Sequence, residues 1–113
     1  MSDLTIKDLS ETVIKRQHFF ADYLNDETIH WDKEEWLIAM MSKIGEIADL
    51  MKMTKLKLYN SDDNMDYQIG YKLSDIIIYS IIFINKLKIE KPEDVIKNAF
   101  NNKSEELRCD IRI

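Results

Sequence analysis

The stretch KLSDIIIYSIIFI, residues 72–84, decides the fold of this chain. Its run from Ile76 to Ile84 is apolar nearly all round, so we expect other parts of the protein to cover it on several sides. Isoleucine and phenylalanine also suit a strand. The length of the segment and the spacing of Lys72, Asp75 and Tyr79 favour a helix instead, because side chains three and four residues apart share one helical face. We therefore predict a helix over about residues 66–88.

The rest of the composition also favours helices. Only two glycines and one proline occur among 113 residues, which is too few turn-forming residues for a β-rich fold. This length and 45% hydrophobic content suit one domain with a modest core. We predict a single all-α domain over residues 1–113, with three main helices and a short C-terminal helix.

The other helices follow from apolar spacing and capping residues. The first is predicted over residues 6–24, where apolar side chains recur at spacings of three, four and seven. The second is predicted to begin after Asp32, which caps the next turn while Glu35 completes a pair typical of a capping box. Its apolar pattern weakens near residues 55–59, where we expect the helix to end. The polar segment 60–64 is predicted to be a loop.

The last helix is predicted from Pro92 to about Asn101. Proline fits a first helical position, and Glu93 and Asp94 are favourable at the positive end of a helix. The tail, residues 103–113, has no strong period.

Charge and cysteine content restrict the partners and the compartment. A net charge of −5 and a pI near 5.0 argue against a nucleic-acid polymer as partner. The single cysteine, Cys109, cannot form an internal disulfide, which indicates a reducing compartment. The N-terminal residues 1–15 lack the apolar region of a signal peptide, and the apolar run 76–84 is far shorter than the roughly 20 residues that span a bilayer. We therefore expect a cytoplasmic protein with no membrane partner.

Two four-residue segments, which we call tetrads, indicate the candidate binding site. Each of them, Lys43-Ile44-Gly45-Glu46 and Lys72-Leu73-Ser74-Asp75, has a lysine three residues before a carboxylate. This spacing puts both charges on one face of a helix. If the two helices pack side by side, two lysines and two carboxylates converge on one small region.

These residues resemble a known family. Residues 36–52 followed by 71–87 are similar to the all-α nucleotide pyrophosphohydrolases called MazG-like, most closely to their deoxycytidine triphosphate pyrophosphatase branch. KIGEIADL, residues 43–50, corresponds to a Glu-x-Gly-Glu-Leu-x-type segment, and KLSDIIIY, residues 72–79, to a Glu-Leu-Ser-Asp segment followed by apolar residues and tyrosine. The resemblance implies a MazG-like helical bundle that is completed by oligomerisation, as a homodimer or homotetramer.

In that family, four carboxylates, two per motif, hold magnesium ions that bind the triphosphate and activate a water for cleavage between the α and β phosphorus atoms. Magnesium prefers oxygen ligands in octahedral geometry, and such a site generates hydroxide and stabilises developing charge. In this chain, the first carboxylate of each motif is replaced by Lys43 or Lys72, and only Glu46 and Asp75 match. A protonated lysine has no lone pair with which to bind a cation, and it repels one.

The same lysines suit a phosphate ligand, because ammonium groups pair directly with phosphate oxygens. The leading hypothesis is therefore a degenerate relative that binds or sequesters a phosphorylated nucleotide, with no cofactor and no hydrolysis. A sink for a nucleotide signal, of the kind a virus would direct at host immunity, is one use of such a protein. Further candidate ligand-binding residues are Tyr79, one turn after Asp75, and His30 and Trp31, which precede the second helix. Asn102 and Lys103 are also candidates, because their segment resembles the one that family members place near the substrate phosphates.

Three alternatives remain open. Lys43 and Lys72 are either exposed or form salt bridges across the two helices in a vestigial site. An active enzyme would hold one magnesium ion with Glu46, Asp49 and Asp75 and release pyrophosphate from a nucleoside triphosphate. The third alternative is a structural or interaction protein, because the apolar third helix suggests that another subunit covers part of its surface.

Overall fold

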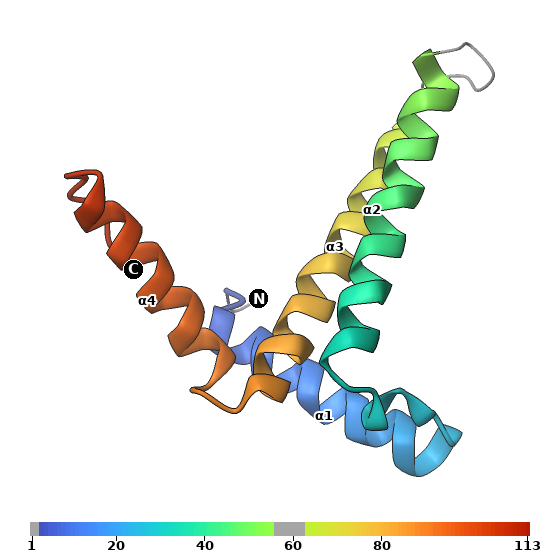
Figure 1. Ribbon diagram of the computed structural model, residues 1–113, viewed down its shortest axis with the longest axis horizontal. Coiled ribbons are helices and arrows are strands. Elements are labelled where there is room, and N and C mark those ends of the chain that lie inside the picture. Colours follow the sequence, from blue (N-terminus) through green and yellow to red (C-terminus); the bar gives the residue numbers. More distant parts are fainter. Residues whose placement is uncertain (1–2, 56–62) are drawn as a thin grey trace. The chain divides into compact units, whose positions relative to one another are not determined.

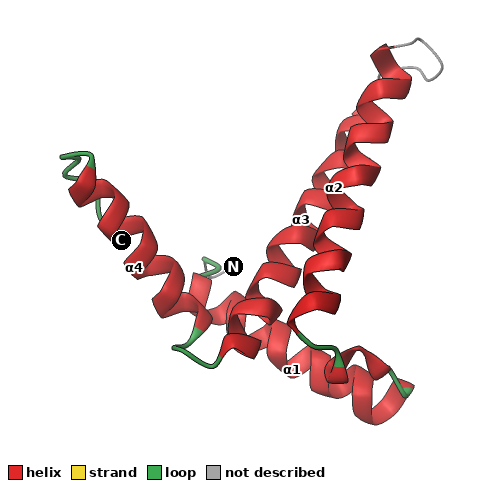
Figure 2. Ribbon diagram, viewed as in Figure 1, coloured by secondary structure: helices red, strands yellow, loops and turns green. Residues whose placement is uncertain are grey.

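The computed structural model describes residues 3–55 and 63–113, and within them all regular structure is helical (Figures 1 and 2). The prediction of an all-α fold is therefore confirmed. Along these described residues, four α-helices and one short 3₁₀ helix follow one another: α1 (Ile6–Leu24), η1 (Glu27–His30), α2 (Lys33–Lys55), α3 (Asp63–Leu87) and α4 (Pro92–Glu106). None of these described helices is long and apolar enough to cross a membrane.

Capping side chains set where the first two long helices begin. Thr5 accepts a hydrogen bond from the Asp8 backbone N–H at 3.0 Å, and the Asp8 carboxylate accepts one from the Thr5 N–H. Asp32 and Glu35 exchange the same pair of hydrogen bonds before α2, at 3.0 and 3.4 Å. Both pairs satisfy N–H groups that lack a partner inside the helix. The predicted capping by Asp32 and Glu35 is confirmed.

The structure differs from the sequence-based expectation at two helix boundaries and in one additional turn. α3 begins at Asp63, so Asp63 and Asn64 are helical rather than part of the predicted loop, whose other residues lie outside the described residues. α4 continues to Glu106 rather than ending near Asn101, since no glycine or proline interrupts residues 101–106. The turn η1 was not predicted. Thr28 N–H donates to Asp26 Oδ1 at 2.8 Å, and Lys86 Nζ donates to the Ile29 carbonyl at 2.6 Å, which holds this turn.

The chain divides into two compact units, Met1–Ile29 with Ile84–Ile113, and His30–Phe83. In the first unit, α1 and α4 contact each other. The prediction of one domain over residues 1–113 stays a prediction.

The second unit contains α2 and most of α3, which lie side by side (Figure 1). Trp36 is almost fully buried, and its ring contacts Trp31 and Tyr79 with centroid distances of 4.9 and 5.5 Å. Along α3, Ile81 and Ile82 are buried as predicted, whereas Ile77 is half exposed in the single chain. The core of this unit therefore lies along the line where the two helices face each other, and it leaves other apolar positions open.

Candidate functional site

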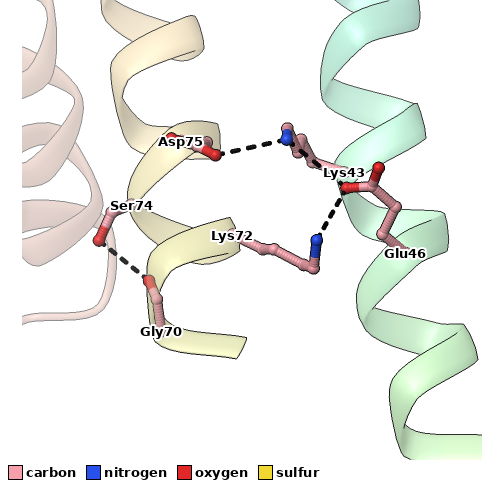
Figure 3. Close-up of polar contacts among 6 residues, drawn as sticks. All are labelled: Lys43, Glu46, Gly70, Lys72, Ser74 and Asp75. Atoms are coloured by element: carbon pink, nitrogen blue, oxygen red, sulfur yellow. Dashed lines mark hydrogen bonds and ion pairs between the residues drawn. The ribbon is translucent and has the colours of Figure 1, made fainter. Parts of the chain in front are cut away.

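The two tetrads converge as predicted, and their four charges form one chain of ion pairs (Figure 3). Lys43 Nζ lies 3.4 Å from Asp75 Oδ2 on the neighbouring helix and 3.6 Å from Glu46 Oε2 on its own helix. Lys72 Nζ donates a hydrogen bond to the same Glu46 oxygen across the helix pair, at 3.2 Å. We call Lys43, Glu46, Lys72 and Asp75 the charge cluster. Its two lysines form salt bridges across the two helices, Lys43 with Asp75 and Lys72 with Glu46, which is one of the alternatives given above.

Helical spacing explains why the lysines point inward. On α2, buried or half-buried side chains occur at positions 36, 40, 43, 47 and 50, with Ala39 also half-buried beside them. Their steps of four and three residues are the pattern by which two helices pack along a seam. Lys43 occupies one of these seam positions, and Lys72 is likewise half-buried on α3. Their side chains are about a quarter exposed, against more than two fifths for Glu46 and Asp75. The lysine stems thus lie between the helices while the ammonium groups reach the surface.

Electrostatics keep Glu46 and Lys43 ionised. The hydrogen bond from Lys72, with the nearby Lys43 charge, holds the pKa of Glu46 below its ordinary value, against a smaller opposing effect of burial. Burial favours a lower pKa for Lys43, but nearby Tyr79, Glu46 and Asp75 together raise its pKa above the ordinary value. At neutral pH, both groups therefore carry their full charge.

An open hollow of about 440 Å³ adjoins the cluster. Four of its lining residues were candidate ligand-binding residues: Trp31, Lys43, Glu46 and Tyr79. Sequence reasoning did not assign Ile38, Ala39 and Ser42 to the site, although they also line it. Their spacing of one, three and four residues along α2, on the same side as Glu46, is the signal that would have found them.

The remaining candidates lie apart from this hollow or in the other unit. His30 ends η1 and precedes Trp31, but it does not line the hollow. Asn102 and Lys103 lie on α4, where Lys103 Nζ pairs with Glu106 at 2.9 Å. Their part in ligand binding stays a prediction.

The alternative magnesium ligands are Glu46, Asp49 and Asp75. Glu46 and Asp75 both contact Lys43, so an ammonium group occupies the space between these two carboxylates. Among residues 3–55 and 63–113, no group of three or more His, Cys, Asp or Glu side chains is arranged to hold a metal ion. What the cluster presents chemically is two ammonium groups that meet at one anionic oxygen.

Comparisons of the chain with protein-family models, with curated proteins and with solved structures find no match.

Proposed function

We propose that the α2–α3 pair binds a small phosphorylated nucleotide without metal-dependent hydrolysis, with Lys43 and Lys72 on the phosphates. One observation carries the proposal: two ammonium groups from different helices approach the same carboxylate oxygen, Glu46 Oε2, at 3.6 and 3.2 Å. Lysines bind a phosphate oxygen in the same way, through ammonium groups that donate charge-assisted hydrogen bonds to it. Glu46 therefore occupies the position that a ligand oxygen would take.

Displacing this internal carboxylate costs little. All four side chains of the charge cluster are partly exposed, and exposed ion pairs contribute only about 0–1 kcal/mol because water screens them. A polyphosphate brings several negative oxygens at once, so it can pair with both lysines while Glu46 turns to solvent. The resemblance to MazG-like enzymes supports the same ligand class, since their corresponding motifs handle the phosphates of a nucleotide.

The hollow supplies a place for the rest of the ligand. It adjoins Lys43 and presents the rings of Trp31 and Tyr79. Aromatic rings of this kind stack on a base and also offer a polar edge. A nucleotide with its phosphates on the lysines and its base in this hollow matches the size and chemistry of the site. We place this activity in the cytoplasm.

Isothermal titration against a panel of linear and cyclic nucleotides, with magnesium and with a chelator, tests the proposal. We expect at least one nucleotide to bind equally well with and without magnesium. The double variant Lys43→Gln, Lys72→Gln is expected to lose this binding. Its matched control is Lys52→Gln, Lys55→Gln, which removes two lysines near the end of the same helix α2. Absence of binding across the panel, or equal loss in both double variants, would refute the proposal.

The runner-up function is an active magnesium-dependent pyrophosphohydrolase. It predicts pyrophosphate release from a nucleoside triphosphate when magnesium or manganese is added, with Glu46, Asp49 and Asp75 as the ligands. Measuring pyrophosphate in the same titration samples separates this enzyme from a binding protein.

A further inference from the structure

A second open hollow, of about 530 Å³, lies on the surface of α3 and is lined by residues of this helix alone. Its members are three or four residues apart or adjacent in sequence, so they are neighbours on the helical surface. We call this site the tyrosine hollow. It comprises Asp66, Tyr67, Gly70, Tyr71 and Ser74.

The hollow forms where a side chain is missing. Apart from the backbone of α3 and the residues next to Gly70 in sequence, no atom lies within 4 Å of the place that a Cβ on Gly70 would take. Two large rings lie beside this gap, because Tyr67 and Tyr71 are 66% and 69% exposed. Their centroids are 6.2 Å apart, and the two ring planes are inclined by 36°. The result is a shallow recess with an aromatic ring on two of its sides.

Every group in this recess suits a positive charge. The face of a tyrosine ring carries the negative part of its quadrupole, and Asp66 adds a carboxylate. The Ser74 hydroxyl donates its proton to the Gly70 carbonyl at 2.9 Å, so its oxygen remains an acceptor. None of the five lining residues is basic. The tyrosine hollow therefore attracts cations and repels phosphates, in contrast to the charge cluster.

From this lining we infer that the tyrosine hollow binds a small soluble molecule through a trimethylated ammonium group. A cation within about 6 Å of an aromatic centroid is attracted to the ring. Because Tyr67 and Tyr71 are 6.2 Å apart, one such group seated over the gap between them contacts both rings. Its methyl groups meet the aromatic carbons, and its charge faces the Asp66 carboxylate. This combination of rings and charge is the one by which proteins recognise quaternary ammonium ligands.

Other cations match the lining less well. Magnesium and calcium need several oxygen ligands, whereas the hollow offers one carboxylate, and no group of three or more His, Cys, Asp or Glu side chains in residues 3–55 and 63–113 is arranged to hold a metal ion. A lysine-type ammonium is strongly hydrated and carries three N–H donors that need acceptors. A trimethylated nitrogen has no N–H group, so it loses no hydrogen bond when the rings replace water.

The ring geometry also excludes a flat base between the two tyrosines. Carbon atoms in contact are about 3.5–4.0 Å apart, so a base stacked between two rings needs them parallel and at least about 7 Å apart. Tyr67 and Tyr71 are closer than this and are not parallel. A rounded head group that sits over both rings needs no such gap.

The tyrosine hollow and the charge cluster lie on different faces of α3. Tyr71 and Ser74 each precede a residue of the charge cluster by one position, which turns them by about 100° around the helix. Figure 3 shows the Ser74 side chain pointing away from Lys43 and Glu46. The inference therefore does not depend on the proposed nucleotide.

NMR titration of the full chain with choline tests the inference. The matched ligand is neohexyl alcohol, in which a carbon atom replaces the charged nitrogen. We expect choline to shift the ring signals of Tyr67 and Tyr71 and to bind at least about fivefold more tightly than the neutral alcohol. Equal affinity for the two compounds, or no binding of choline, would overturn the inference.

Tyrosine variants test the role of the rings. Replacing both Tyr67 and Tyr71 by leucine is expected to weaken choline binding about 5- to 25-fold, since each exposed ring contributes about two- to fivefold. Tyr23→Leu is the matched control, because Tyr23 is a similarly exposed tyrosine, 73%, on α1. Equal weakening in the control and in the double variant would contradict this role.

A glycine variant tests the hollow itself while keeping the helix. Gly70→Leu fills the recess, and leucine is a better helix former than glycine, so we expect an unchanged circular dichroism spectrum and loss of choline binding. Gly45→Leu is the matched control, because Gly45 on α2 also has open space at its Cβ position. Equal choline binding by the two variants would place the site elsewhere and overturn the inference. Tighter binding to a trimethyllysine peptide or to phosphatidylcholine vesicles than to choline would overturn the assignment to a small molecule.

Discussion

Replacing Glu46 by glutamine removes the negative charge that occupies the proposed phosphate position. Glu46 Oε2 is the shared partner of Lys43 and Lys72, at 3.6 and 3.2 Å. As long as it stays ionised, it competes with the ligand for both ammonium groups and repels the incoming phosphates. The depressed pKa of Glu46, caused first by the Lys72 hydrogen bond and then by the Lys43 charge, keeps it ionised at neutral pH. We therefore expect Glu46→Gln to bind a nucleotide more tightly than the wild type.

The size of this gain follows from the distance. Two unit charges about 4 Å apart in water interact strongly enough to change an equilibrium constant about fivefold. A ligand with several phosphate charges near position 46 raises that factor, whereas salt lowers it because charges beyond about 10 Å are screened at 0.1 M ionic strength. We expect a five- to tenfold lower dissociation constant for Glu46→Gln at low salt, and a smaller gain at high salt.

Isothermal titration with inorganic triphosphate and with the tightest nucleotide measures this effect. Glu34→Gln serves as the matched control, because it removes a carboxylate from the first turn of the same helix without touching the charge cluster. A gain only in Glu46→Gln supports displacement of Glu46 by phosphate. Weaker binding in Glu46→Gln would refute this reasoning, and that sign is the one expected if Glu46 held a magnesium ion.

Three further predictions concern stability. The pKa of Glu46 is lowered in the folded protein, so the contribution of this carboxylate to folding stability is complete above the unfolded pKa of 4.5 and is lost as pH falls through the lower folded pKa. Urea midpoints should therefore fall more steeply below about pH 4.5 in the wild type than in Glu46→Gln. Parallel plots of urea midpoint against pH for the two proteins would contradict this. Trp36→Ala should lower the free energy of unfolding by about 3–5 kcal/mol, since Trp36 is almost fully buried against Trp31 and Tyr79. Trp36→Phe should cost much less, because the indole N–H has no hydrogen-bond partner among the described residues, and equal losses in urea denaturation would count against this packing. Asp32→Ala should cost about 1 kcal/mol by removing the cap of α2, with Asp32→Asn retaining most of it, as thermal unfolding followed by circular dichroism would show.

Local signals in the sequence predicted most of the helical framework. The capping pair of Asp32 and Glu35 and the apolar period of α1 act within a few residues, so they are readable without tertiary information. The early start of α3 and the extension of α4 to Glu106 were missed because polar residues tolerate both helix and loop. No glycine or proline marks those boundaries.

The charge cluster could be predicted from the sequence only in part. Spacing predicted that Lys43 and Glu46 share a face, and the two motifs predicted that Lys72 and Asp75 lie opposite them. Salt bridges of the two lysines with Asp75 and Glu46 across the helices were one open alternative, but spacing did not decide between them and exposed lysines, because that depends on the register of two helices. The bridging role of Glu46 emerged only from the packed helices, and it is the basis of the proposed ligand position.

Titration of the wild-type protein and of the Lys43→Gln, Lys72→Gln variant with a nucleoside triphosphate, in the presence of a metal chelator, tests the central claim most directly. We predict that the wild type binds without magnesium and that the variant does not. Wild-type protein that shows no binding without metal, or a variant that binds as tightly as the wild type, would contradict the claim that these two lysines hold the phosphates.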